Sequence, residues 1–147
     1  MIISEITIPD PIEYLTFGKK KPKKYYLTAN IFYGTVHHFI RSKIVTECKL
    51  FLHNHLMKVP KITVPVAIVV EYHSHKNGEF DIDNKGYLWG KLIQDWLVKN
   101  SRISTDSVKN IQGVIYLYKR GSPKLIIKII DIESLLDFID SDRMYGI

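Results

Sequence analysis

Residues 61–99, KITVPVAIVVEYHSHKNGEFDIDNKGYLWGKLIQDWLVK, contain a strand pattern followed directly by a helix pattern. Residues 61–72 are rich in β-branched side chains and end before the turn-forming sequence HKNG, which predicts a β-strand. Pro65 places this strand near a sheet edge or at a bulge. Apolar residues then recur at helical spacing from about residue 84 to residue 99. This stretch therefore predicts a strand and a helix that together form the centre of the fold.

The flanking sequence supplies the remaining elements. The patterns predict strands over residues 1–8, 110–119 and 123–131, a long amphipathic helix over 36–57, and a short acidic helix that starts near Asp131 or Ser134. The sequence RGSP between the last two strands predicts a hairpin, and FGKKKPKKYY predicts a basic loop. The order β-α-β-α-β-β-α predicts one small α/β (α+β) domain over residues 1–147. We expect a mixed four-stranded sheet, two main helices and a short C-terminal helix.

Composition narrows the class of protein. A chain of 147 residues that is 46% hydrophobic suits one domain with a sizeable core and argues against wholesale disorder. No apolar run approaches the ~20 residues of a membrane span, and the N-terminus lacks a secretory signal pattern. Cys48 is the only cysteine, so an internal disulfide is excluded and a reducing, cytoplasmic location is expected.

The net charge of +6 is unevenly distributed. Lysine, arginine and all the histidines dominate residues 18–76, whereas the acids gather in residues 77–110 and in the tail. A basic body with locally confined acids is typical of a protein that binds a polyanion. A solvated basic surface without a ligand is the alternative interpretation.

One face of the helix over residues 84–99 mixes apolar and polar side chains. Helical spacing places on it Asn84, Tyr87, Leu88, Lys91, Leu92 and Asp95. A face that served only the core would not normally carry an amide, a cation and an acid. Other groups must therefore satisfy these polar side chains.

The acids before this helix form a D-x-D motif. In an extended strand end, Asp81 and Asp83 point to one side and can share a divalent cation. Mg²⁺ takes one or two carboxylates and fills its other positions with water and phosphate oxygens. Asp106, in the loop before the next strand, is the candidate third acid for attack on a phosphodiester. The alternative for one of these acids is an ordinary helix N-cap.

These motifs resemble the RusA-like Holliday junction resolvases. That family carries an acid-x-acid-Asn motif, which Asp81, Asp83 and Asn84 match, then a lysine and an acid one turn apart, matched by Lys91 and Asp95. NIFY, at Asn30 to Tyr33, matches the family's Asn-x-x-Tyr/Trp. The resemblance covers most of the chain and is most specific over residues 80–109.

The resemblance implies a homodimeric endodeoxyribonuclease, of phage or prophage origin, that cuts four-way DNA junctions symmetrically with Mg²⁺, or Mn²⁺ as a substitute. Its metal ligands would be Asp81, Asp83 and Asp106, with Lys91 as the catalytic cation and Asn84 and Asp95 in support. The DNA-binding residues would be Lys19, Lys20, Lys21, Lys23, Lys24, Asn30, Tyr33, Lys85, Lys109 and Lys119. Tyr25, Tyr26 and Tyr33 would stack on bases; tyrosines packed in strands or core are the alternative.

The chain departs from the family pattern at two places. The interval from Asn84 to Lys91 is four residues longer, which moves Lys91 by ~6 Å along the helix axis and makes Lys85 an alternative working lysine. Thr105 stands where the family has the first acid of a pair that Asp106 completes.

Two other functions remain open at this point. The first is a protein that binds junctions or single strands on the same fold without efficient cleavage. The second is a small basic regulator that binds duplex DNA, although no helix-turn-helix spacing or zinc-ligand pattern supports it.

Overall fold

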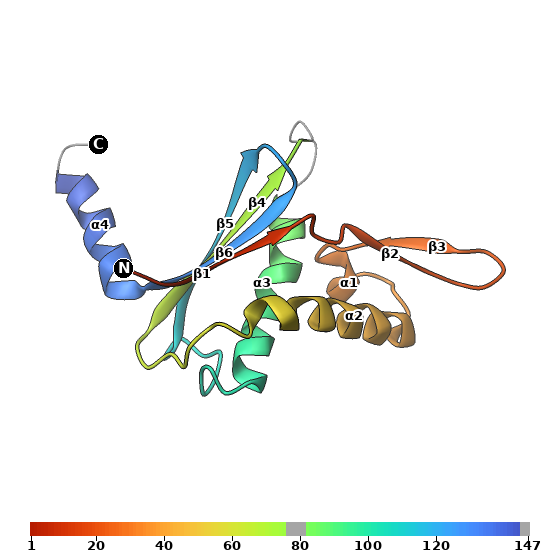
Figure 1. Ribbon diagram of the computed structural model, residues 1–147, viewed down its shortest axis with the longest axis horizontal. Coiled ribbons are helices and arrows are strands. Elements are labelled where there is room, and N and C mark those ends of the chain that lie inside the picture. The colour runs from red at the N-terminus through yellow and green to blue at the C-terminus, as the bar shows by residue number, and fades with distance from the viewer. Residues whose placement is uncertain (76–81, 145–147) are drawn as a thin grey trace.

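Strand β4 (Val66–Ser74) is the centre of the fold, because all nine of its residues are buried. The computed structural model describes residues 1–75 and 82–144, without the side chains of residues 83, 84, 138 and 141–144. β4 pairs in parallel with β5 (Ile111–Arg120) and antiparallel with β6 (Lys124–Asp131), and β6 pairs antiparallel with β1 (Ile2–Pro9). The strand order is therefore β1-β6-β4-β5 (Figure 1).

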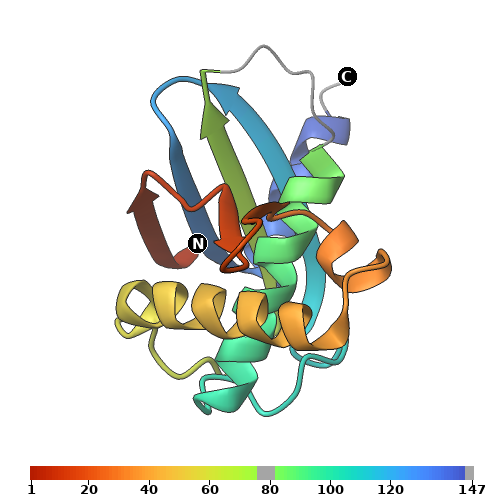
Figure 2. The same cartoon turned by 90° about the vertical axis from the view of Figure 1, so that its right-hand side faces the viewer.

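The two faces of this sheet differ. Alternation along β4 turns Ile68, Val70 and Tyr72 toward the helices, where they join the apolar core. Helices α2 (His38–Leu56) and α3 (Ile82–Lys99) lie across that face (Figure 2). Within the part of the chain that is described, no helix is long and apolar enough to cross a membrane.

Two glycines let α3 approach the sheet closely. A Cβ at Gly86 would lie 2.6 Å from the Tyr116 ring on β5, and one at Gly90 would lie 3.1 Å from it. Both glycines are buried, and the helix buries Leu88, Trp89 and neighbouring apolar residues against the core. The glycines thus fix α3 against β5.

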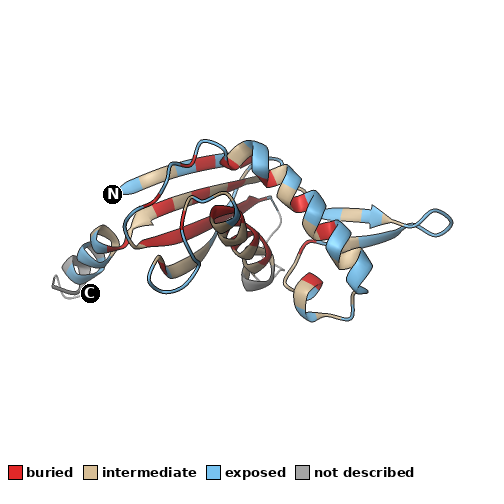
Figure 3. Cartoon of the chain, turned by 90° about the horizontal axis from the view of Figure 1, so that it is seen from below, coloured by how far each residue is buried: buried red, intermediate tan, exposed pale blue. Residues whose placement is uncertain are grey.

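Three smaller elements complete the described chain. Strands β2 (Tyr14–Phe17) and β3 (Lys23–Tyr26) form a separate two-stranded hairpin, which projects from the body in Figure 1. The short helix α1 (Asn30–Tyr33) is tied to α2 by Arg41, whose guanidinium donates to the carbonyl oxygens of Ile31 and Val36. Helix α4 (Ile132–Met144) leads away from the sheet with much of its surface exposed (Figure 3).

The mixed four-stranded sheet and the two long helices confirm the predicted fold class. The helices predicted over 36–57 and 84–99 are α2 and α3. The C-terminal helix starts where predicted, since the Asp131 carboxylate accepts a hydrogen bond from the Glu133 backbone N–H at 2.9 Å.

The predicted hairpin between the last two strands is wrong. β5 and β6 lie on opposite sides of β4, and the Gly121 N–H donates to the Ser74 carbonyl at 3.1 Å as the connection crosses the end of β4. The buried β4 takes the inner position because both of its edges are then paired, with β6 on one side and β5 on the other.

The predicted edge position of the strand after Pro65 is also wrong, because β4 is an inner strand that begins after the proline. The bulge alternative agrees with a register shift between Val66 and Ala67. The predicted basic loop over residues 17–26 is wrong in part, since β3 and the end of β2 lie within it. Gly18 and Pro22 flank the hairpin turn rather than interrupting all regular structure.

Candidate functional site

The acidic motif lies at the N-terminal end of α3. The helix begins at Ile82, so the backbone of Asp83 and Asn84 forms its first turn. Asp81, and the side chains of Asp83 and Asn84, lie outside the described part of the structure. The described backbone thus places Asp83 and Asn84 at the start of α3.

Lys85 lies beside this first turn. Its Nζ is 5.3 Å from the centre of the Tyr72 ring on β4. The Tyr72 hydroxyl donates to the Glu13 carboxylate at 3.3 Å, and burial together with Glu13 raises the Tyr72 pKa well above its ordinary value. Tyr72 therefore stays a neutral donor, and the ammonium of Lys85 lies against an aromatic ring near the mouth of the helix.

The mixed face of α3 is divided between the core and α1. Leu88 and Leu92 are buried, whereas the Tyr87 hydroxyl is hydrogen-bonded to the Tyr33 hydroxyl of α1. That hydrogen bond, together with burial, raises the Tyr87 pKa to about 12. The Lys91 ammonium lies 3.7 Å from the Asp95 carboxylate. These contacts give Tyr87, Lys91 and Asp95 polar partners beside the core leucines, whereas the Asn84 side chain lies outside the described part of the structure.

Asp106 lies in the loop between α3 and β5 and is exposed. It lines a pocket of about 340 Å³ together with Asp95, Val98, Lys99, Ser104 and Thr105. The Asn110 side-chain amide orders this loop by donating to the Ser104 hydroxyl at 3.1 Å and the Thr105 carbonyl at 2.8 Å. The second acidic position therefore adjoins the C-terminal half of α3.

The two acidic positions lie at opposite ends of the helix. From Asp83 to Val98, beside Asp106, the helix rises by about 22 Å. The strands agree, because the Val66 N–H at the start of β4 donates to the Asn110 carbonyl at 2.9 Å, whereas α3 begins beyond the end of β4. Among the side chains that are described, no three His, Cys, Asp or Glu residues form a group that could hold a metal ion. One chain thus does not bring Asp106 beside Asp83.

The predicted DNA-binding residues are spread over several parts of the fold, and Lys85 in the first turn of α3 is one of them. The hairpin turn and β3 carry exposed Lys19, Lys20, Lys21, Lys23 and Lys24. Asn30 and Tyr33 are exposed on α1, and Lys109 is exposed in the loop that carries Asp106. Lys119 lies apart from them, on the sheet face away from α3.

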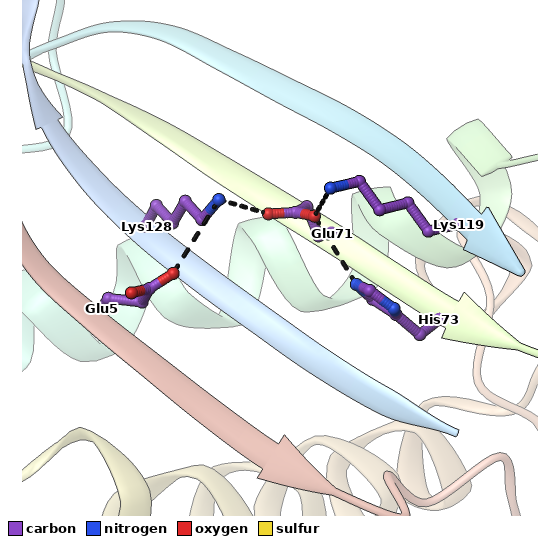
Figure 4. A network of polar contacts seen from close by, with 5 residues as sticks. All are labelled: Glu5, Glu71, His73, Lys119 and Lys128. Carbon is purple, nitrogen blue, oxygen red and sulfur yellow. Dashed lines mark ion pairs between the residues drawn. The ribbon is translucent and has the colours of Figure 1, made fainter. Parts of the chain in front are cut away.

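Lys119 belongs to a network around a buried glutamate (Figure 4). The Glu71 carboxylate, 1% exposed on β4, lies 2.7 Å from Lys128, 3.0 Å from Lys119 and 3.5 Å from His73. Burial alone would raise the Glu71 pKa, but hydrogen bonds from Lys128 and Lys119 outweigh it and lower the pKa to about 2. Both lysines are therefore engaged by a carboxylate of their own chain.

Sequence reasoning missed two residues: the buried Glu71 on β4 and the exposed Tyr14 on β2. Glu71 had a signal, because a carboxylate within a continuously apolar strand needs a cationic partner. Tyr14 also had one, since YLTF alternates as an amphipathic strand does and precedes KKYY by a turn that Gly18 and Pro22 flank.

No protein-family model matches the chain, and no characterised protein matches it significantly in sequence. The site is therefore interpreted from its own residues. Carboxylates at the two ends of α3 offer the hard oxygen donors that Mg²⁺ prefers. The exposed lysines of the hairpin offer the charge that a polyanion requires.

Proposed function

We propose that this chain is a Mg²⁺-dependent, structure-selective endodeoxyribonuclease that resolves four-way DNA junctions by symmetric phosphodiester hydrolysis. The observation that carries the proposal is the motif Asp81-Ile82-Asp83-Asn84 at the start of α3 in an otherwise basic chain. The resemblance of this motif and its surroundings to the RusA-like resolvases supplies the reaction and the substrate.

Asp81, Asp83 and Asp106 would hold the metal ion. Carboxylates of this kind fit Mg²⁺, and the exposure of Asp106 leaves its oxygens accessible. When bound, the ion would supply Lewis acidity toward water and the phosphate. Lys85, two residues from Asp83, would offset charge on the phosphate. Lys91 is eight residues from Asp83 and is already paired with Asp95, so it would support the site through that pair.

The separation of Asp83 and Asp106 makes the site depend on a second copy of the chain. In a two-fold dimer, a contact between the start of α3 in one copy and the Asp106 loop of the other occurs twice. Each of the two sites would then contain Asp81 and Asp83 from one copy and Asp106 from the other. Two symmetric sites are also what paired cuts in opposed strands require.

The lysine-rich hairpin and Lys109 would bind the DNA backbone. Their side chains are exposed, and contacts of this kind position DNA without reading its sequence. The contribution of Lys119 would be smaller, because the buried Glu71 carboxylate already holds its ammonium at 3.0 Å.

A labelled four-way junction tests the proposal directly. Purified protein should produce paired, symmetric nicks with Mg²⁺ and none with EDTA, and Asp83→Asn should remove them while junction binding persists. Mn²⁺ should substitute for Mg²⁺. Tight junction binding with intact strands in both metals would overturn the nuclease proposal and leave a junction-binding protein. Equal affinity for branched and linear duplex DNA would indicate the regulator instead.

A further inference from the structure

The β2–β3 hairpin has one inner and one outer face. Its strands pair Tyr14 with Tyr26 and Leu15 with Tyr25, so alternate pairs point in opposite directions. Leu15, Phe17 and Tyr25 pack against the core, with the rings of Phe17 and Tyr25 6.1 Å apart. These inner contacts hold the hairpin to the body and leave the outer face to solvent.

The outer face presents a pair of exposed aromatic rings. Tyr14 is 42% exposed and Tyr26 57% exposed, and their ring centres lie 5.8 Å apart. Large aromatic side chains left in solvent as a pair, on an arm that projects from the body, suit a ligand with flat apolar faces.

Positive charge surrounds these rings. The Lys24 ammonium lies 4.6 Å from the centre of the Tyr14 ring, and the turn adds exposed Lys19, Lys20 and Lys21. Residues 14–26 contain no acid. The ligand that matches flat faces beside a run of cations is a strand that alternates bases and phosphates.

We propose that the outer face of the β2–β3 hairpin binds unpaired nucleotides of a DNA strand, with bases stacked on Tyr26 and Tyr14 and phosphates contacted by Lys24 and the turn lysines. The inference rests on the proposed function for DNA as its ligand and adds a site distinct from the acids of α3. The inference also gives the two adjacent tyrosines different roles: Tyr25 packs against the core, and Tyr26 is exposed and would contact the ligand.

Two oligomers of equal length and charge test this site. One is single-stranded oligothymidylate of about 12 nucleotides, and the other is an abasic strand with the same phosphates. Binding is measured in EDTA by fluorescence anisotropy. The native chain should bind oligothymidylate about 5- to 100-fold more tightly than the abasic strand, because only the former can stack.

Substitutions in the hairpin test whether it causes the preference for oligothymidylate over the abasic strand. Tyr26→Ile keeps an apolar residue that suits a strand but removes the ring, and it should reduce the preference for bases by about 5-fold or more, because only Tyr14 remains to stack. Tyr26→Phe should retain it. Lys24→Met should weaken binding to both oligomers, and Phe39→Ala, an exposed aromatic residue on α2, should change neither. Circular dichroism and the melting temperature show whether each variant stays folded.

Equal binding of the two oligomers by the native chain, or an unchanged preference in folded Tyr26→Ile, would overturn the stacking site. A hairpin that contacts only the backbone would give the first result. The assay needs neither metal nor cleavage, so its outcome is independent of the nuclease proposal. A chain that stacks bases but never nicks a junction would retain this inference and lose the proposed reaction.

Discussion

The two ends of helix α3 carry acids of similar chemistry in different surroundings. At the N-terminal end, the first turn contains Asp83 and lies near the ring of Tyr72, and Gly86 is pressed against Tyr116. At the C-terminal end, Asp106 is exposed on a loop ordered by the neutral amide of Asn110. The comparison teaches that one helix keeps the two acidic positions apart, so that the proposed metal site needs the N-terminal end of one copy and the C-terminal end of another.

The largest effect is expected when one acid is replaced at a time, which compares the two ends of α3 directly. Asp106→Asn should lower junction nicking more than about 100-fold, to the level of Asp83→Asn, because each variant lacks one of the proposed metal ligands. Asp95→Asn alters the same pocket but removes the partner of Lys91, so a loss of about 10-fold or less is expected. Full activity of Asp106→Asn in a nicking assay would show that Asp106, at the C-terminal end of α3, does not belong to the site.

The sheet beside the start of α3 depends on an ionised group. Glu71→Gln should lower the free energy of unfolding by on the order of 3 kcal/mol near neutral pH, because the variant leaves two lysines and a histidine around a neutral amide. The native Glu71 pKa of about 2 lies below its ordinary value of 4.5. Its stabilisation is therefore complete above about pH 4.5 and is lost as the pH falls toward about 2.

Urea unfolding at several pH values checks this expectation. The native chain should lose stability between about pH 4.5 and about pH 2 more steeply than Glu71→Gln. Glu47→Gln, at an exposed position on α2, serves as the matched control. Parallel curves for the native chain and Glu71→Gln would contradict the assigned pKa.

The packing of α3 against β5 should be tighter at Gly86 than one turn later. Gly86→Ala should lower the free energy of unfolding by about 1–3 kcal/mol, because its Cβ would lie 2.6 Å from the Tyr116 ring. Gly90→Ala should stay within about 1 kcal/mol of the native chain, since the gain in helix propensity offsets a milder contact at 3.1 Å. Equal melting temperatures for the two variants would contradict this difference.

The smallest effect is expected in the Asp106 loop. Asn110→Ala removes neutral hydrogen bonds near the surface and should cost about 0.5–1.5 kcal/mol of stability. Nicking should fall severalfold in the same variant because the loop no longer holds Asp106 in place. Asn54→Ala, at an exposed position on α2, is the control. Unchanged nicking by an Asn110→Ala variant that is measurably destabilised would show that nicking does not depend on the hydrogen bonds that order this loop.

The long helices were predictable from sequence, because helical periodicity over many residues is a strong local signal. Strand pairing was not, since the order β1-β6-β4-β5 results from competition to cover β4, and RGSP alone cannot reveal it. The separation of Asp83 from Asp106 followed in principle from the length of the predicted helix at ~1.5 Å per residue. The proposal that a second copy completes the site also needed the position of the loop after α3.

Mixing two inactive variants tests the shared site most directly. Asp83→Asn and Asp106→Asn should each be inactive alone, but a heterodimer of the two would contain one intact site, made from the unaltered ends of both chains. After the variants exchange subunits, single nicks should reappear at about a quarter of the native number of active sites. A site contained within each chain would leave every heterodimer inactive. Restored nicking on mixing would support the shared site, and continued inactivity after demonstrated subunit exchange would contradict it.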